Sequence, residues 1–243
     1  MSKRVGVRKY LLAISSFLVV ACSSNSRQVK VINAGIPGNN SEELLNRIRT
    51  GFPLPIPDIA IIMVGTNDML NTGKMLTYHD YEHNLKLLVA YFQRKGSKVI
   101  LASPPPIDSI YLFERHDKKD FLQSPNVKLD SVREKARQVS AALKTGFVDV
   151  FKEFKNKKIP DHNRDIFIQN PINTGQRDGV HPTAEGARLI ARLIAGYIQD
   201  NGLCRSGCSI YCLGDSITYG KGLKGEGSTN GETYPAFLSR LLH

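Results

Sequence analysis

The stretch "IYCLGDSITYG", Ile210–Gly220, is the part of this 243-residue chain that decides its fold class. Its apolar first half is typical of a buried strand, and Gly214 follows at the point where such a strand would turn sharply. The turn presents a serine, Ser216, close to the end of the chain. An element of this kind usually stands at the start of a domain. Because it lies near the end of this chain, the residues that would act together with Ser216 are expected upstream of it.

Short apolar runs alternate with amphipathic segments along the rest of the chain. Runs typical of strands occur at 29–35, 58–65, 98–106, 146–151 and 209–216, and helical periodicity occurs at 41–49, 81–96, 127–146, 183–200 and 234–242. Apolar runs that alternate with helices favour a mostly parallel sheet covered on both faces. The sequence therefore predicts an α/β fold of the doubly wound, flavodoxin-like type, a three-layer α/β/α sandwich.

The composition fits one globular domain with a strongly basic balance. Hydrophobic residues make up 41% of the chain, and the formal net charge is +11. The chain has no dense arginine-rich stretch with interleaved aromatic residues and no recognition-helix or zinc-knuckle signature, so nucleic acid is not an expected partner. A basic protein next to anionic lipid is the better interpretation of the charge.

The first residues carry processing information. "MSKRVGVRK" is a positively charged segment, "YLLAISSFLVVA" is a short apolar segment, and the cysteine Cys22 follows Ala21. "LVVAC" resembles a bacterial lipobox, which implies a lipoprotein signal peptide at 1–21, lipid attachment to Cys22 and a polar tether at 22–27. An ordinary secretory signal cut nearby is the alternative. Ser23 after the cysteine favours the outer membrane, and either pathway exports residues 28–243 as a single domain.

Three cysteines remain after the leader. Export permits a disulfide, and "CRSGC", from Cys204 to Cys208, could close a small loop. Cys212 lies on an apolar strand, where a buried thiol is expected. Three cysteines without a nearby fourth ligand make a poor zinc site.

Polar motifs follow the ends of the predicted strands. They are "NAGIPGNN" at 33–40, "VGTNDML" at 64–70, "SPPPID" at 103–108 and "LGDSITYG" at 213–220, and the loop "RDGVHP" at 177–182 leads into the last long helix of the series. Each motif alone is equally typical of a turn or a helix cap. Ligands of parallel α/β sheets bind at the carboxyl ends of the strands, so these motifs are expected to share one site.

Together the motifs resemble the four blocks of the SGNH, or GDSL, hydrolase superfamily. "GDSITYG", a glycine of "NAGIPGNN", "GTND" and "DGVHP" match the blocks, and "YP" follows on the helix after the serine loop. The resemblance implies a Ser-His-Asp triad. Ser216 is the expected nucleophile, His181 the base that takes and returns its proton, and Asp178 the group that orients the imidazole.

The same resemblance implies an oxyanion hole. Its donors would be the backbone N–H groups of Ser216 and Gly38 and the side-chain amide of Asn67. Gly38, rather than Gly35, matches the family position in the loop after the first strand. Asp215 and Asp68, the neighbours of two of these residues, are expected to accept hydrogen bonds within their own loops.

The order of the blocks departs from the family pattern. The serine block usually comes first, whereas here the serine strand and its helix, 209–243, follow "DGVHP". The chain is therefore expected to be circularly permuted by one strand–helix unit, with the serine strand in the centre of the sheet. Because every covering helix returns the chain to the same end of a parallel sheet, the connector at 201–208 can reach the start of that strand, and the site is expected to stay intact.

These features predict an exported, lipid-anchored serine esterase of carboxylic esters, and the resemblance implies that it needs neither a metal nor an organic cofactor. Acetylated glycans, lysophospholipids and short-chain esters are the expected substrates, and the loop from Pro104 to Pro125, with Tyr111, Phe113 and Phe121, is expected to shape the pocket. Core packing is the alternative role of those three aromatic residues. The residues leave two other functions open: acyl transfer to a glycan hydroxyl, and a non-catalytic surface-binding lipoprotein on the same fold.

Overall fold

The computed structural model describes Met1 and residues 28–51 and 55–243. Cys22, the rest of the expected leader from residue 2 and the tether at 22–27 lie outside the described residues. The strands and helices, in chain order, are β1 Lys30–Gly35, α1 Ser41–Arg49, β2 Ile59–Met63, α2 Thr66–Leu70, α3 Tyr78–Arg94, β3 Lys98–Ala102, α4 Ser109–Leu112, a 3₁₀ turn η1 Lys118–Asp120, α5 Pro125–Leu143, β4 Gly146–Val148, α6 Val150–Asn156, α7 Ala184–Asp200, β5 Ser209–Gly214, α8 Ser216–Tyr219 and α9 Tyr234–Leu241.

The five described strands form one parallel sheet in the order β1-β5-β2-β3-β4. Strand β5, the last along the chain, is hydrogen-bonded to β1 on one side and to β2 on the other. All five residues of β2 are buried, as expected of a central strand whose two faces are both covered. The prediction of a mostly parallel α/β sheet is therefore confirmed, with the serine strand inside the sheet.

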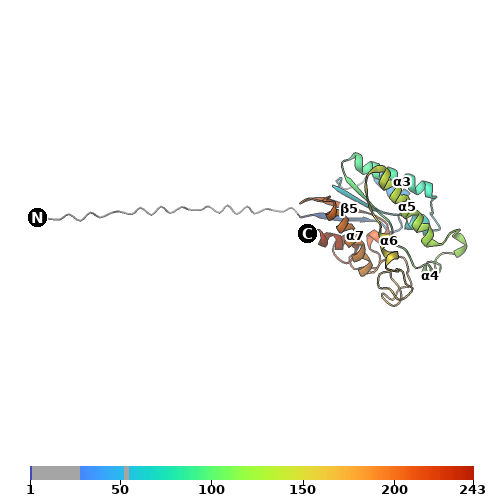
Figure 1. Ribbon diagram of the computed structural model, residues 1–243. Coiled ribbons are helices and arrows are strands. Elements are labelled where there is room, and N and C mark those ends of the chain that lie inside the picture. Colours follow the sequence, from blue (N-terminus) through green and yellow to red (C-terminus); the bar gives the residue numbers. More distant parts are fainter. Residues whose placement is uncertain (2–27, 52–54) are drawn as a thin grey trace.

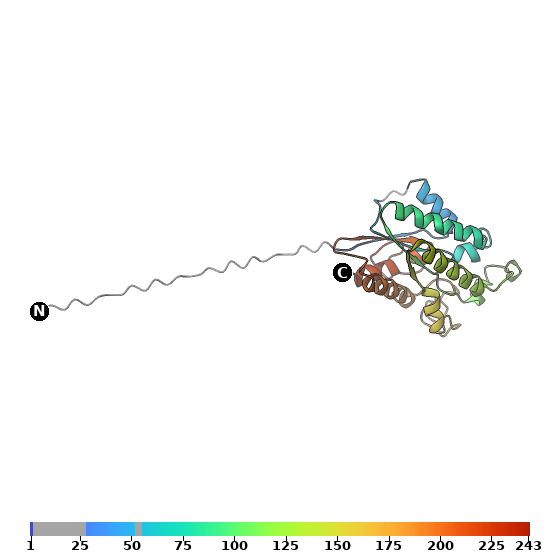
Figure 2. The ribbon, with the colours of Figure 1, turned by 45° about the horizontal axis from the view of Figure 1, so that its top comes forward.

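Helices cover both faces of the sheet and form two outer layers (Figures 1 and 2). Apolar side chains of α1, α3 and α5 pack on one face, and those of α6, α7 and α9 pack on the other. Each layer contributes its own hydrophobic cluster, so the sheet is the middle of a three-layer sandwich. None of the helices in the described residues is long and apolar enough to cross a bilayer.

The strand expected at 146–151 is shorter in the structure and ends at Val148. Asp149 accepts a hydrogen bond from the backbone N–H of Lys152 and thereby begins α6, a helix that the sequence analysis did not anticipate. An aspartate in this position satisfies one of the free N–H groups at a helix start. The local capping interaction therefore takes residues 150 and 151 out of the strand.

The amino end of β5 is held by a disulfide in the connector from α7. Cys204 and Cys208 are bonded to each other, and Cys212, within β5, is a buried free thiol. Burial raises the pKa of the Cys212 thiol, which keeps it protonated. The loop that the sequence left open as a possible disulfide is thus closed, at the end of the sheet opposite the serine turn.

Candidate active site

Ser216 stands at the carboxyl end of β5, in a turn that the neighbouring residues define. Asp215 accepts a hydrogen bond of 2.8 Å from the backbone N–H of Ile217, and Ser216 is the first residue of the short helix α8. Gly214 has no room for a side chain, because a Cβ there would overlap the Met63 carbonyl and the Thr218 side chain. The glycine therefore lets the turn pack directly against β2.

Three side chains from two separate loops form a continuous series of hydrogen bonds. His181 Nε2 lies 2.9 Å from Ser216 Oγ, and His181 Nδ1 lies 2.8 Å from Asp178 Oδ2. The structure thus brings together the serine, histidine and aspartate that the sequence predicted as partners, despite their order along the chain. The arrangement matches the geometry by which serine triads are recognised.

The second oxygen of Asp178 holds the loop that carries the histidine. Asp178 Oδ1 accepts backbone N–H groups of Val180, at 2.8 Å, and of His181, at 2.6 Å. Burial opposes ionisation of this carboxyl, but its hydrogen bonds with His181 and the loop outweigh that effect and lower its pKa to about 2. Asp178 is therefore an anion at neutral pH, in contact with the imidazole.

The predicted oxyanion-hole residues lie around the same point. Gly38, Asn67, His181 and Ser216 all line one cleft of about 550 Å³. One N–H of the Asn67 amide donates to the Asn39 carbonyl at 3.0 Å, which orients the amide and leaves its second N–H for a ligand. Gly38 adopts a φ of 81°, a conformation that favours glycine. Gly35 does not line the cleft and packs under the serine turn instead.

The two neighbouring aspartates lie beneath the site and do not line the cleft. Asp68 is fully buried and accepts the backbone N–H of Ser41 at 3.0 Å, which ties α2 to the start of α1. Burial raises the pKa of Asp68 to about 6, and it raises the pKa of Asp215 to about 6 as well. Asp215 accepts a hydrogen bond within its own loop, as the sequence analysis expected, whereas Asp68 accepts one from a separate segment, the start of α1.

The loop from Pro104 to Pro125 does border the cleft, through residues that the sequence analysis did not single out. Leu112, Arg115 and His116 line the wall. The three aromatic residues do not: Tyr111 is buried, and the rings of Phe113 and Phe121 pack edge to face at 5.7 Å. Their contribution is packing, which was the alternative interpretation.

Arg115 also contacts the backbone of the aspartate loop. Its guanidinium donates to the carbonyl of Arg177 at 2.8 Å and to that of Asp178 at 2.6 Å. The neighbouring His116 lies 3.0 Å from the Thr72 hydroxyl, and burial, followed by the charge of Arg115, lowers its pKa. No sequence pattern marks Arg115, because backbone carbonyls are acceptors at every position of a chain.

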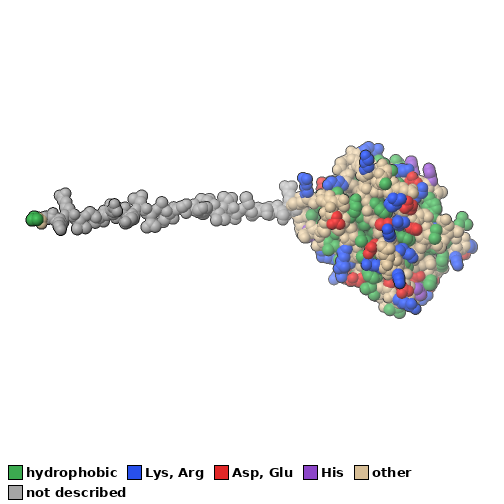
Figure 3. All heavy atoms as spheres, viewed as in Figure 1, with side chains coloured by type: hydrophobic (Ala, Val, Ile, Leu, Met, Phe, Trp, Pro, Cys, Tyr) green, Lys and Arg blue, Asp and Glu red, His purple; other side chains and the backbone are tan. Residues whose placement is uncertain are grey.

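The surface around these elements carries mixed charge. Figure 3 shows lysine and arginine side chains interspersed with acidic ones over the visible face. Within residues 28–51 and 55–243, no group of three or more His, Cys, Asp or Glu side chains is arranged to hold a metal ion.

A model of the GDSL-like lipase/acylhydrolase family matches residues 15–189, which is more than half of the chain. The chain belongs to this family. The matched GDSL-like residues include the loops of Gly38, Asn67 and His181 and end before β5. The family resemblance inferred from the sequence motifs is thereby confirmed.

Three similar proteins share 21 to 26% of their aligned residues with this chain. A Bacillus subtilis protein described as the uncharacterized lipoprotein YqeF is 26% identical over 171 residues, which cover 66% of this chain and 70% of the relative. A lipase/acylhydrolase from Enterococcus faecalis shares the fold with a TM-score of 0.54 at 21% identity, covering 72% of this chain and 96% of that one. Axe2, an acetylxylan esterase from Geobacillus stearothermophilus, has a TM-score of 0.51 at 21% identity, covering 66% of this chain and 68% of its own.

Proposed function

We propose that this protein is a serine esterase that hydrolyses carboxylic esters with Ser216 as its nucleophile. The observation that carries the proposal is the series of hydrogen bonds from Asp178 through His181 to Ser216 Oγ, at 2.8 and 2.9 Å. Membership of a family of lipases and acylhydrolases supports the same chemistry. The cleft beside Ser216 is open, so an ester can reach the hydroxyl.

The proposed reaction has two halves. Ser216 Oγ attacks the acyl carbon while His181 Nε2 accepts the hydroxyl proton, and the carbonyl oxygen becomes an oxyanion. The backbone N–H groups of Ser216 and Gly38 and the free N–H of Asn67 stabilise that charge. The carbon–oxygen bond to the alcohol then breaks, and His181 returns the proton to the leaving alcohol. Water, deprotonated by His181, releases the acid from Ser216 in the second half.

An acetylated or otherwise short-chain ester of a glycan is the proposed substrate class. The cleft wall combines apolar surface with the polar side chains of Arg115, His116, Lys221 and Glu226, which can form hydrogen bonds with a polar alcohol portion. The acetylxylan esterase that shares the fold points in the same direction.

A serine-directed fluorophosphonate probe tests the proposal. Wild-type protein is expected to be labelled and the Ser216→Ala variant is not. Absence of labelling in the wild type, or equal labelling of both, would favour a non-catalytic binding protein. Rates on p-nitrophenyl esters of increasing chain length, together with acetate release from acetylated xylan, define the substrate. Product analysis with a glycan acceptor present distinguishes hydrolysis from acyl transfer.

We further infer that residues 28–243 form one exported domain anchored through lipid on Cys22, with Ser23 favouring the outer membrane. The similarity to the lipoprotein YqeF supports an anchored envelope protein. Replacement of Cys22 by alanine is expected to move the protein from the membrane fraction to the soluble fraction. Retention of the variant in the membrane fraction would contradict the anchor.

We also infer that the chain is circularly permuted relative to the usual order of the family. The serine strand β5 lies between β1 and β2 although it comes last. Residues 28–29 and 241–243 line the same hollow at the amino end of the sheet, and Figure 1 shows the C-terminus beside the start of β1. A variant that joins these ends and opens the chain within 201–208 is expected to fold and keep its activity. Failure of that variant to fold would count against the inference.

A further inference from the structure

Gln169 is a buried residue in the segment that connects α6 to α7. Its exposed fraction is 4%. Its backbone N–H donates to the His181 carbonyl at 2.9 Å, and its own carbonyl accepts the N–H of Gly179 at 2.9 Å. Ile168 and Pro182 form an antiparallel bridge beside it. The backbone around Gln169 therefore runs alongside the loop that carries the histidine.

The side-chain amide of Gln169 joins that loop to the serine loop. Gln169 Nε2 donates to the Pro182 carbonyl at 3.0 Å and to the Lys221 carbonyl at 2.9 Å. Pro182 follows His181 directly, and the N–H of Lys221 donates to the Ser216 carbonyl at 3.0 Å. Both N–H groups of one amide are thus used to connect the backbone next to the base with the backbone next to the nucleophile.

The serine loop is shaped to receive this amide. Gly222, next to Lys221, adopts a φ of 80°, and a Cβ there would lie 2.8 Å from Gln169 Oε1 and 2.9 Å from Nε2. Only a residue without a side chain can let the backbone approach the amide so closely in that conformation. The contact between the two loops is therefore a packed one, and the amide has little room to move.

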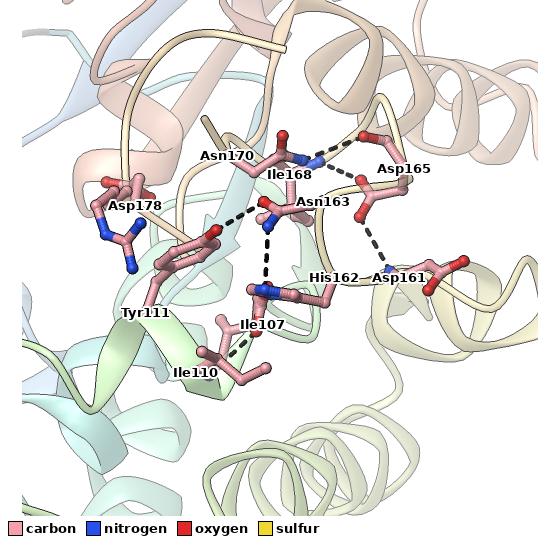
Figure 4. Close-up of polar contacts among 12 residues, drawn as sticks. Ile107, Ile110, Tyr111, Asp161, His162, Asn163, Asp165, Ile168, Asn170 and Asp178 are labelled. Carbon is pink, nitrogen blue, oxygen red and sulfur yellow. Dashed lines mark hydrogen bonds and ion pairs between the residues drawn. The ribbon is translucent and has the colours of Figure 1, made fainter. Parts of the chain in front are cut away.

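The segment that holds Gln169 is itself fixed by short-range polar contacts. Asp165 Oδ1 accepts the N–H groups of Phe167 and Ile168, each at 2.8 Å, and Asn170 Nδ2 donates to the carbonyls of Asp165 and Ile168 at 3.2 and 3.1 Å. Figure 4 shows Asn170 facing Asp165 and Ile168. These contacts flank Gln169 on both sides and restrict its backbone.

Two further contacts connect the same segment to α4. The Tyr111 hydroxyl donates to Asn163 Oδ1 at 2.6 Å (Figure 4). His162 Nδ1 lies 2.6 Å from Asp108 Oδ2. The N–H of Asp108 in turn donates to the Gly179 carbonyl at 2.7 Å. These contacts with α4 and its N-cap residue restrain the segment, and they therefore restrict the position of Gln169.

We propose that Gln169 is a positioning residue that holds His181 and Ser216 at hydrogen-bond distance by joining the carbonyls of Pro182 and Lys221. The two loops follow different parts of the chain, and β5 reaches the site only after α7, so no short stretch of backbone sets their separation. A displacement of about 1 Å between reacting groups can lower a rate about 100-fold. The catalytic meaning of this inference rests on the proposed esterase function.

The test compares Gln169→Met, which keeps the length of the side chain and removes both donors, with Gln93→Met as a control. The Gln93 amide also donates to a backbone carbonyl, that of Leu143 at 3.0 Å, but it lies on α3 away from the cleft. We expect kcat on p-nitrophenyl acetate and the rate of fluorophosphonate labelling to fall about 10- to 100-fold in Gln169→Met, with KM within about threefold of wild type. The control is expected to keep wild-type kinetics.

A role in folding alone would lower the melting temperature of Gln169→Met and leave kcat per labelled site unchanged, and that result would overturn the proposal. The ¹⁵N NMR signal of the His181 imidazole gives a readout that needs no activity: loss of the hydrogen bond to Ser216 in Gln169→Met supports the proposal, and its persistence refutes it. Wild-type protein that resists labelling would refute the esterase and leave this NMR result to decide the role of Gln169. If Gln169→Met does not fold, Gln169→Asn, with an amide one methylene shorter, is measured by the same readouts.

Discussion

Replacement of Asp178 by asparagine is expected to reverse the direction of both hydrogen bonds that join residue 178, His181 and Ser216. Asp178 Oδ1 is held by two backbone N–H donors, at 2.8 and 2.6 Å, so the amide oxygen of the asparagine takes that position. Its NH₂ group then faces His181 Nδ1, where Oδ2 lies at 2.8 Å in the wild type. Because NH₂ donates, Nδ1 becomes the acceptor and Nε2 carries the proton. Nε2 then donates to Ser216 and cannot accept its proton.

The magnitude of the loss has two sources. The contacts of Asp178 lower its pKa from 3.8 to about 2 against the effect of burial, and such a shift corresponds to about 2 kcal/mol. Stabilisation of the imidazolium by the carboxylate is lost on that scale, and the cost of the wrong tautomer adds to it. We expect kcat to fall about 10³- to 10⁴-fold at pH 7, or about 4–5.5 kcal/mol. KM is expected to change little, because Asp178 does not line the cleft.

The assay is hydrolysis of p-nitrophenyl acetate between pH 5 and 9, with protein concentration corrected for the folded fraction. Asp58→Asn is the matched control, since Asp58 also accepts a backbone N–H, that of Ser209 at 2.7 Å, but at the opposite end of β5. The control is expected to keep wild-type kcat. A folded Asp178→Asn variant within tenfold of wild-type kcat at pH 7 would refute the assigned role of the carboxylate.

Three further predictions concern the oxyanion site, a buried carboxyl and the disulfide. Asn67→Ala removes one oxyanion donor and is expected to lower kcat about 10²- to 10³-fold, and an unchanged kcat would remove Asn67 from the site. Burial raises the pKa of Asp68 from 3.8 to about 6, so the folded protein binds this proton more tightly than the unfolded chain and loses stability as pH rises through that interval. Urea unfolding at pH 4 and 7 should therefore show the stability of wild type relative to Asp68→Asn falling by about 2 kcal/mol, and a pH-independent difference would contradict this. Reduction of the Cys204–Cys208 disulfide releases a loop of about five residues and is expected to cost about 2 kcal/mol of stability, measured as a lower melting temperature. The kcat on p-nitrophenyl acetate at 25 °C is expected to stay unchanged, and a parallel loss of kcat would show that the disulfide affects the candidate active site.

The strand and helix pattern could be predicted from the sequence because each element carries its own local signal. The apolar runs at 58–65 and 209–216 lack the helical period, and the carboxyl ends of parallel strands meet at one edge. That rule groups the loops of Gly38, Asn67 and Ser216, and the resemblance to the SGNH superfamily adds His181 and Asp178. Where a cap competed with a strand, as at Asp149, the local prediction was wrong by a few residues.

The sequence by itself determined the fold class, because that depends on side-chain type and periodicity, and its family resemblance predicted the candidate site residues and the central position of the serine strand. Only the tertiary structure decided how the loop of Ser216 and the loop of His181 are held against each other. Gln169 acts on the carbonyls of Pro182 and Lys221, and Arg115 acts on those of Arg177 and Asp178. A backbone carbonyl is the same acceptor at every residue, so no pattern of letters reveals which one a distant amide or guanidinium will reach.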